Sequence, residues 1–198
     1  DIRNPLTAVR MMCRVMAETY EDASTREKFD RIVPRELERA SRVIEDMLDL
    51  ARSGELQLAS LDINALVLQA LDLFEQECQV QAIEVRRKLA PVLPAARADE
   101  KRLHRALTNI IQNAIQAMPQ GGALTVATAL APLPVAATPE QVPDVGAALQ
   151  DCIQITLSDT GAGIPKDQLP HIFDPFFTTK TKGLGLGMAI THRILEDH

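Results

Sequence analysis

Apolar residues in the first 52 residues form a narrow stripe, which restricts the fold more than any other feature of the chain. They recur at intervals of three and four in two stretches: Leu6, Val9, Cys13, Met16 and Tyr20 in the first, and Phe29, Val33, Leu37, Ala40, Ile44, Met47 and Ala51 in the second. This spacing predicts two amphipathic helices joined by a polar turn at residues 21–25. A narrow stripe is typical of a coiled coil or four-helix bundle. Because one hairpin supplies half of such a bundle, we expect a homodimer through the hairpin.

Local signals set the limits of this hairpin. Ser24 or Thr25 is the expected N-cap of the second helix. Pro34 is expected to kink that helix or delay its start, because proline cannot donate a backbone hydrogen bond. Ser53 and Gly54 end the hairpin. We therefore predict a helical-hairpin domain over residues 1–54 and a second domain over residues 55–198.

The second domain mixes strand and helix patterns and belongs to the α+β class. Short stretches alternate in polarity like strands at residues 56–58, 83–89, 124–128 and 153–157. Asp62 and Asp99 are the expected N-caps of two helices, the second running to about residue 118, and a last helix begins near residue 186. Residues 130–150 are rich in Ala, Pro and Val, and we expect a mobile loop without chemistry of its own. The order of elements predicts a two-layer α/β sandwich with a mixed sheet.

Three polar segments in the second half of the chain together predict a nucleotide site. Asn109 and Asn113 lie four residues apart in a helical pattern, so they share one side of a helix. Residues 159–163 place a carboxylate and two glycines in a turn after an apolar strand, and residues 183–187 are a glycine-rich loop before a helix. A carboxylate can accept a hydrogen bond from adenine, carboxamide oxygens can ligate Mg²⁺, and such a loop offers N–H groups to phosphate. We interpret the set as a Mg-ATP site.

Two other phosphate-binding motifs do not fit the glycine run at residues 183–187. The dinucleotide-binding fingerprint requires a preceding strand and a different glycine spacing. The P-loop requires a Gly-Lys-Ser/Thr sequence, which is missing here. Each of the three polar segments taken alone is also compatible with ordinary surface structure, so the prediction rests on their order and separation.

Composition and charge argue against two classes of partner, nucleic acid and membrane. The net charge is −6, whereas binding to a phosphate backbone requires a basic surface, so we expect no nucleic acid partner. No apolar run approaches the roughly 18 residues of a membrane span, so we expect no membrane contact by this segment. Cys13, Cys78 and Cys152 have no metal-like spacing and suit free thiols in a reducing compartment. We expect a cytoplasmic location, with any membrane anchor outside this segment.

The order of the motifs resembles that of bacterial sensor histidine kinases. Residues 109–117, 159–163, 172–180 and 183–187 resemble the N, G1, F and G2 boxes of that family, and Asp1-Ile2-Arg3-Asn4-Pro5-Leu6 resembles its H box without the histidine. The resemblance covers essentially the whole chain. It implies a dimerisation and histidine-phosphotransfer hairpin followed by an ATP-binding domain of the Bergerat (GHKL) type.

The resemblance implies a role for each matching residue. Asn113 would ligate Mg²⁺ and Asn109 would support the phosphates. Asp159 would accept the adenine amine, with Gly161 and Gly163 allowing close approach of the backbone. The lid and the glycine-rich loop supply the other expected binding residues: Phe176, Thr178, Lys180, Lys182, Gly183, Gly185 and Gly187. Phe173, Phe176 and Phe177 would pack together at the foot of this lid. The lysines would meet phosphate, and the glycines would wrap the triphosphate.

The resemblance also implies the reaction. The phosphoacceptor histidine is expected directly before Asp1, outside this sequence, and Asp1 would help to accept its proton. The γ-phosphoryl group of ATP would pass to this histidine and then to the receiver domain of a response regulator. Asn4 would position water for dephosphorylation of that regulator. Two alternatives are a GHKL-type ATPase, which has a glutamate where Asn109 stands, and a degenerate ATP-binding scaffold.

Overall fold

The computed structural model describes residues 3–20, 22–51, 55–134, 149–180 and 184–198. These residues form two compact units. The first lies within residues 1–54 and 171–193, and the second within residues 55–170 and 194–198. The domains expected from the sequence, 1–54 and 55–198, stay a prediction.

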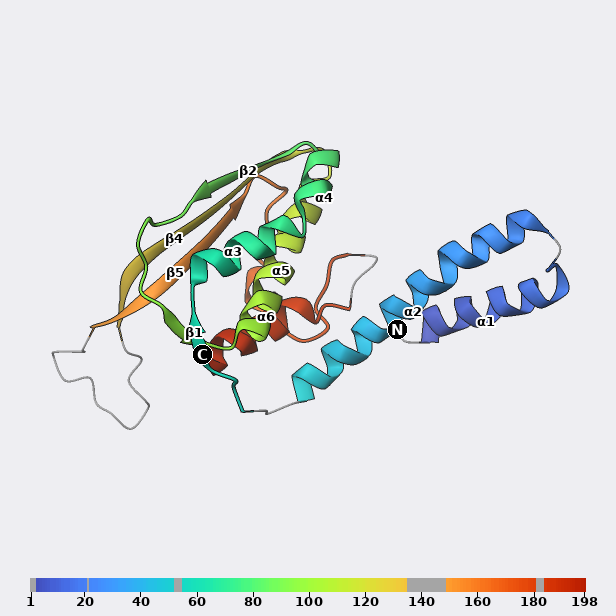
Figure 1. The fold of residues 1–198 in the computed structure, drawn as a ribbon, viewed down its shortest axis with the longest axis horizontal. Coiled ribbons are helices and arrows are strands. Elements are labelled where there is room, and N and C mark those ends of the chain that lie inside the picture. The colour runs from blue at the N-terminus through green and yellow to red at the C-terminus, as the bar shows by residue number, and fades with distance from the viewer. Residues whose placement is uncertain (1–2, 21, 52–54, 135–148, 181–183) are drawn as a thin grey trace. The chain divides into compact units, whose positions relative to one another are not determined.

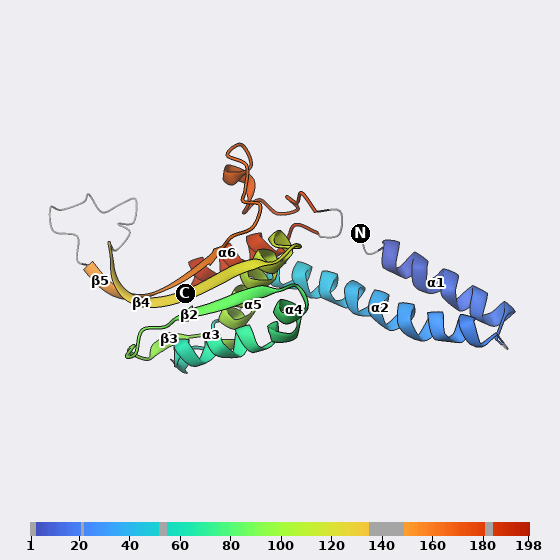
Figure 2. The same ribbon diagram turned by 90° about the horizontal axis from the view of Figure 1, so that it is seen from above.

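Two helices form the expected hairpin in the first unit. They are α1 (Arg3–Glu18) and α2 (Ala23–Ala51), which lie side by side in both ribbon views (Figures 1 and 2). Pro34 lies inside α2, and the helix begins well before it. The expected delay of the helix start is therefore wrong, because the rest of the helix offsets the one backbone donor that proline removes.

The N-cap of α2 differs from the expected one. The helix begins at Ala23, and Asp22 caps it: its carboxylate accepts from the N–H groups of Ser24 at 3.1 Å and Thr25 at 3.2 Å. The hydroxyl groups of Thr25 and Ser24 also donate to this carboxylate, at 2.7 and 3.0 Å. These hydrogen bonds, the one from the Thr25 hydroxyl first, lower the pKa of Asp22 to about 2. Ser24 and Thr25 are therefore not the cap; a carboxylate accepts from more donors than a hydroxyl can.

The apolar stripe of the hairpin is covered only in part. Val33, Ala40 and Val43 of α2 are buried. Other apolar residues of the hairpin are about half exposed or more in the single chain: Leu6, Met11, Tyr20, Leu37, Ile44 and Leu48. The hairpin thus presents apolar surface that its own residues do not cover.

A three-stranded mixed sheet forms one layer of the second unit. Its order is β2 (Ile83–Lys88), β4 (Gly122–Pro134) and β5 (Leu149–Asp159), side by side in Figure 2. β2 runs parallel to β4, and β4 runs antiparallel to β5. The expected strands at residues 83–89, 124–128 and 153–157 are confirmed. The last two extend into the expected loop of residues 130–150, of which residues 135–148 lie outside the described part of the chain.

A second, two-stranded sheet pairs β1 (Ala59–Leu61) with β3 (Ala96–Ala98). The expected strand at residues 56–58 is therefore wrong by three residues. Residues 56–58 alternate in polarity but do not pair with a described strand, because β3 pairs with residues 59–61 instead. A short pattern of alternation does not by itself fix the register of pairing.

Three helices form the other layer of the second unit. They are α3 (Ile63–Asp72), α4 (Glu75–Val80) and α5 (Glu100–Ala117), which lie on the same face of the sheet in Figure 1. Between the layers lies an apolar core formed by Ile63, Leu66, Val67, Ala70, Leu71, Cys78, Ile83, Leu107, Ile111, Ala114, Ile115, Met118, Leu124 and Val126. The predicted α+β class and two-layer sandwich with a mixed sheet are confirmed. A last helix, α6 (Gly187–Asp197), begins close to the predicted residue 186.

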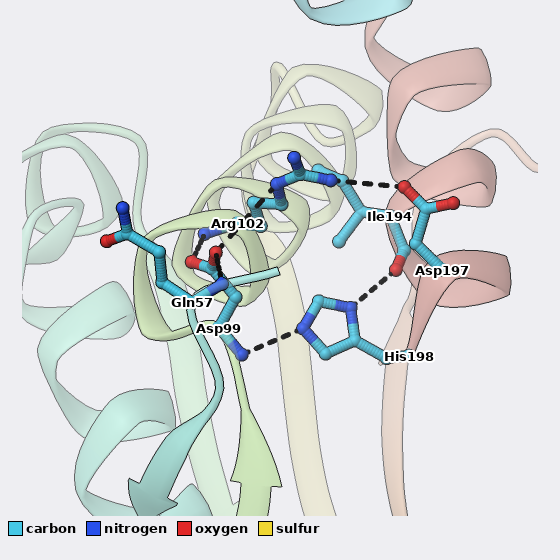
Figure 3. Close-up of polar contacts among 6 residues, drawn as sticks. All are labelled: Gln57, Asp99, Arg102, Ile194, Asp197 and His198. Atoms are coloured by element: carbon cyan, nitrogen blue, oxygen red, sulfur yellow. Dashed lines mark hydrogen bonds and ion pairs between the residues drawn. The ribbon is translucent and has the colours of Figure 1, made fainter. Parts of the chain in front are cut away.

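Asp99 caps α5, as predicted, and also holds the segment before β1 (Figure 3). One carboxylate oxygen accepts from the N–H of Arg102 at 3.1 Å, and the other from the N–H of Gln57 at 3.0 Å. Burial raises the pKa of Asp99, but these two hydrogen bonds and the charge of Arg102 outweigh it, so the pKa lies below its usual value. Asp62 caps α3 in a simpler way: among the described residues, its carboxylate accepts only from N–H groups of its own helix.

The same cluster joins the start of α5 to the end of α6 (Figure 3). The N–H of Asp99 donates to Nε2 of His198 at 2.9 Å, and Nη1 of Arg102 donates to Asp197 at 3.1 Å. Because Nε2 of His198 accepts, its Nδ1 carries the hydrogen and donates to the carbonyl oxygen of Ile194 at 2.7 Å.

We expect Asp99→Ala to lower the free energy of unfolding by about 2 kcal/mol, because it removes a helix cap and leaves the Gln57 N–H without its acceptor. The matched change Asp62→Ala, which removes an exposed cap only, should cost about 1 kcal/mol. A carboxylate with a lowered pKa stabilises the fold above its unfolded pKa of about 3.9, and this stabilisation is lost as the pH falls through the folded value. Urea unfolding at neutral and acid pH measures both effects, and equal losses for the two variants would contradict this role of Asp99.

Candidate nucleotide-binding site

The two carboxamide residues lie in the C-terminal half of α5. Asn109 and Asn113 are four residues apart and half-buried, so they share one side of the helix. Ile111 and Ile115 of the same helix are buried in the core. Packing of these isoleucines against the sheet fixes the helix, and with it the positions from which both carboxamides project.

Asp159 lies at the end of β5, in a turn that contacts the end of α5. Its Oδ1 accepts a hydrogen bond from the N–H of Gly161 at 2.9 Å. The N–H of Ala162 donates to the carbonyl oxygen of Ala117 at 3.2 Å. Ala117 is the last residue of α5 and lies one helical turn after Asn113. The carboxylate turn and the carboxamide helix therefore belong to one local structure.

The two glycines of this turn meet different requirements. A Cβ atom at Gly161 would lie 2.7 Å from both the Cβ and the carbonyl oxygen of Ala117, and 2.8 Å from Oδ1 of Asp159. Gly163 has a φ of +73° and open space around its Cα atom. Gly161 is thus required by close packing, whereas Gly163 is favoured by its left-handed backbone.

The predicted lid and glycine-rich loop meet in the first unit, at Phe176 and Gly185. The N–H of Phe176 donates to the carbonyl oxygen of Gly185 at 3.0 Å. Both residues have a left-handed backbone, with φ of +70° and +69°. A Cβ atom at Gly185 would lie 2.6 Å from the carbonyl carbons of Phe176 and Phe177. Close contact between these two backbones therefore excludes any side chain at residue 185.

The remaining predicted site residues lie in the lid, at the start of α6 and in the first turn of α1. Oγ1 of Thr178 accepts from the N–H of Lys180 at 3.1 Å, and partial desolvation lowers the pKa of the Lys180 ammonium group. Gly187 is the first residue of α6, and Asn4 lies in the first turn of α1. Three expected site residues lie outside the described part of the chain: Asp1, Lys182 and Gly183.

The structure therefore brings the predicted residues together in two groups. Asn109, Asn113, Asp159, Gly161 and Gly163 belong to the second unit, where the end of α5 and the turn after β5 are in contact. The described lid and loop residues belong to the first unit: Phe176, Thr178, Lys180, Gly185 and Gly187. The individual roles of these residues stay predictions.

The donor set of the second unit fits ATP and Mg²⁺. Among the described residues, the N–H of Gly161 uses Oδ1 of Asp159, so Oδ2 can accept from an adenine amine. The side-chain oxygen of Asn113 is a hard ligand of the kind that Mg²⁺ prefers. Within the described ranges there is no group of three or more His, Cys, Asp or Glu residues that could hold a metal ion.

Sequence reasoning missed the contacts that hold these segments. It did not connect Ala117 with the turn, although the carbonyl oxygen and methyl group of Ala117 set the position of Gly161. It treated Phe176 as a packing aromatic, whereas its left-handed backbone joins the lid to Gly185. No residue type signals either contact, because alanine at a helix end is common and phenylalanine rarely adopts a positive φ.

Comparison with known proteins gives two matches to family models. Residues 98–198 match the family described as histidine kinase-, DNA gyrase B-, and HSP90-like ATPase. Residues 1–56 match the His Kinase A (phospho-acceptor) domain. The first match spans α5, the turn at Asp159 and α6.

The chain belongs to the histidine kinase-like ATPase family. Together with the phospho-acceptor match, this gives the chain the two domains of a sensor histidine kinase catalytic core. The sensor histidine kinase ZraS of Escherichia coli strain K12 is 33% identical over 198 residues, which cover 100% of this chain and 39% of ZraS. Sporulation kinase C of Bacillus subtilis is 29% identical over 199 residues, covering 100% of this chain and 42% of that kinase. The histidine kinase core thus spans about two fifths of these relatives.

Solved structures share the fold of this histidine kinase core. Full-length ShkA in complex with AMPPNP has a TM-score of 0.70 and 27% identity, over 98% of this chain and 38% of ShkA. ThkA in complex with the response regulator protein TrrA also has a TM-score of 0.70, over 99% of this chain and 52% of ThkA; at 24% identity it shows the fold alone. The family match supports ATP binding by residues 98–198. None of the described helices is long and apolar enough to cross a membrane.

Proposed function

We propose that this histidine kinase core binds Mg-ATP and transfers the γ-phosphoryl group to a histidine that directly precedes Asp1 in the intact protein. The phosphoryl group then passes to an aspartate in the receiver domain of a response regulator. The observation that carries this proposal is the presence, in one chain, of a phospho-acceptor match at residues 1–56 and an ATPase match at residues 98–198. The proposed domains are the hairpin, residues 1–54, and the ATP-binding domain, residues 55–198.

The proposed site uses the residues of the second unit to hold the nucleotide. Oδ2 of Asp159 accepts a hydrogen bond from the adenine amine, and the backbone at Gly161 and Gly163 lies close to the base. Asn113 holds Mg²⁺ and Asn109 supports the phosphates. Bound Mg²⁺ supplies neutralisation of the charge on the β- and γ-phosphates. The protein contributes position and charge rather than a covalent intermediate on this domain.

The proposed lid supplies cations and backbone donors to the triphosphate. Lys180 and Lys182 meet the phosphates as point charges. Residues 183–187 present N–H groups at the N-terminus of α6, where the helix dipole favours an anion. Phe176 and Thr178 form the base of this lid. In the transfer step the imidazole nitrogen attacks the γ-phosphorus, the bond to the bridging oxygen breaks, ADP leaves, and Asp1 accepts the imidazole proton.

The proposed partners are a second copy of the chain and a response regulator. The uncovered apolar residues of the hairpin, such as Leu37 and Ile44, provide the surface for a four-helix bundle between two copies. ThkA, which shares the fold, was solved in complex with a response regulator. Asn4, in the first turn of α1, would position water for dephosphorylation of the regulator. We place this segment in the cytoplasm.

The test of this function uses the full-length protein and γ-³²P-ATP. We expect label on the protein that is lost in acid and kept in base, as for a phosphohistidine, and no label on the Asn113→Ala variant. Rapid release of free phosphate without labelled protein would favour the ATPase alternative. Nucleotide binding with neither label nor hydrolysis would favour the scaffold alternative. Either of these results would overturn the kinase assignment.

A further inference from the structure

Thr160 continues the pairing of β4 with β5 for one residue beyond the sheet. Leu124 is paired with Asp159, so Ala123 comes opposite Thr160. The N–H of Thr160 donates to the carbonyl oxygen of Ala123 at 3.2 Å, and the N–H of Ala123 donates to Oγ1 of Thr160 at 3.0 Å. In a regular antiparallel pair the second bond would end on the backbone carbonyl of residue 160. The side-chain hydroxyl takes the place of that carbonyl.

This replacement lets the backbone leave the strand directly after Asp159. Ala162, whose N–H would face β4 if the strand continued, donates instead to the carbonyl oxygen of Ala117, and the N–H of Gly161 donates to Oδ1 of Asp159. Asp159 is therefore held by strand pairing on one side and by the turn on the other. Thr160 is the residue that joins these two restraints.

The hydroxyl group of Thr160 has a second partner besides the N–H of Ala123. It donates to the sulfur of Met118 at 3.7 Å, and Met118 is only 1% exposed. A Cβ atom at Gly122 would lie 2.6 Å from this hydroxyl oxygen and 2.8 Å from the same sulfur. Glycine at residue 122 thus leaves the space in which the hydroxyl reaches both its acceptor and its donor.

We propose that Thr160 is a positioning residue for adenine recognition, acting through Asp159. By holding the start of the turn to Ala123, its hydroxyl keeps the Asp159 carboxylate in the orientation that receives the exocyclic amine of the base. This inference rests on the proposed function of Asp159. It predicts that Thr160 affects the binding of nucleotides that carry the amine more than the binding of nucleotides that lack it.

Two substitutions separate the hydroxyl from the shape of the side chain. Thr160→Val keeps the shape but leaves the N–H of Ala123 without its acceptor. Thr160→Ser keeps the hydroxyl and removes only a methyl group. If the valine variant is unstable, Thr160→Ala replaces it. The alanine and serine variants differ only by the hydroxyl group, so their comparison isolates the same hydrogen bonds.

The experiment measures the affinity of the full-length protein, with Mg²⁺, for ATP and for purine riboside triphosphate, which lacks the amine. We expect Thr160→Val to weaken ATP binding about tenfold, as for loss of one well-placed hydrogen bond. Binding of purine riboside triphosphate should change less than about threefold, and Thr160→Ser should restore ATP binding. In an Asp159→Asn background, Thr160→Val should have little further effect on ATP.

The outcomes separate this inference from the function on which it rests. Wild-type protein that does not bind ATP, or that does not prefer it to the nucleotide without the amine, overturns the role of Asp159 and with it the role of Thr160. Wild-type protein that shows the preference, with a valine variant that weakens both nucleotides equally or neither, overturns the role of Thr160 alone.

Discussion

Gly161→Ala is expected to lower the affinity of the full-length protein for ATP on the order of 100-fold. The new methyl group would overlap the Cβ atom and carbonyl oxygen of Ala117, at 2.7 Å, and Oδ1 of Asp159, at 2.8 Å. The two atoms of Ala117 are a methyl group and a backbone oxygen at the end of α5, and neither can move aside without moving the helix end. The turn must shift, which breaks the bond from Ala162 to Ala117 and displaces the Asp159 carboxylate. Calorimetric titration with ATP measures the loss.

Gly163→Ala is the matched control for this prediction. It adds the same methyl group two residues away, where no atom lies within 4 Å, at a φ of +73°. In the protein without nucleotide its cost is therefore conformational only, about 1–2 kcal/mol for a left-handed residue with a side chain. Equal losses of ATP affinity in the two variants would show that the contact with Ala117 is not what Gly161 provides.

Gly185→Ala is expected to have a similarly large effect on ATP binding, on the order of 100-fold. Here the two costs combine, because the residue is left-handed and its Cβ atom would lie 2.6 Å from the carbonyl carbons of Phe176 and Phe177. The bond from the Phe176 N–H to the Gly185 carbonyl would break. Hydrogen exchange of the Phe176 N–H reports this local change, and ATP titration reports its consequence.

Gly163→Ala serves here as well, because its φ of +73° is close to the +69° of Gly185 while its surroundings are open. The difference between the two variants therefore measures the contact with the lid. Unchanged exchange of the Phe176 N–H in Gly185→Ala protein would contradict the contact described here.

Local signals in the sequence were enough to predict the elements that carry the site. Asp62 and Asp99 were identified as caps because a carboxylate before a helical pattern accepts from N–H groups within the same turn. The alternation around Val85, Val126 and Ile155 predicted three strands of the mixed sheet, and the stripe at intervals of three and four predicted the hairpin. These features depend on neighbours in the sequence.

Features that depend on contacts between distant segments were not predictable. The shift of β1 to residues 59–61 is set by pairing with Ala96–Ala98, far along the chain. The extension of β4 and β5 depends on their mutual pairing, although Ala- and Pro-rich composition favours a loop. Likewise, the contact of Gly161 with Ala117 joins residues that no local pattern connects. The cap of α2 is a local feature that was predicted wrongly: Asp22 rather than Ser24 caps the helix, because one carboxylate reaches donors on two residues.

Calorimetric titration of Mg-ATP into the full-length protein and its Asp159→Ala and Asn113→Ala variants tests the central claim most directly. We expect saturable binding by the wild-type protein and a loss on the order of 100-fold for each variant, because each removes a charged or metal-binding contact to the nucleotide. Wild-type protein that takes up no ATP, or variants that bind it as tightly as the wild type, would contradict the account.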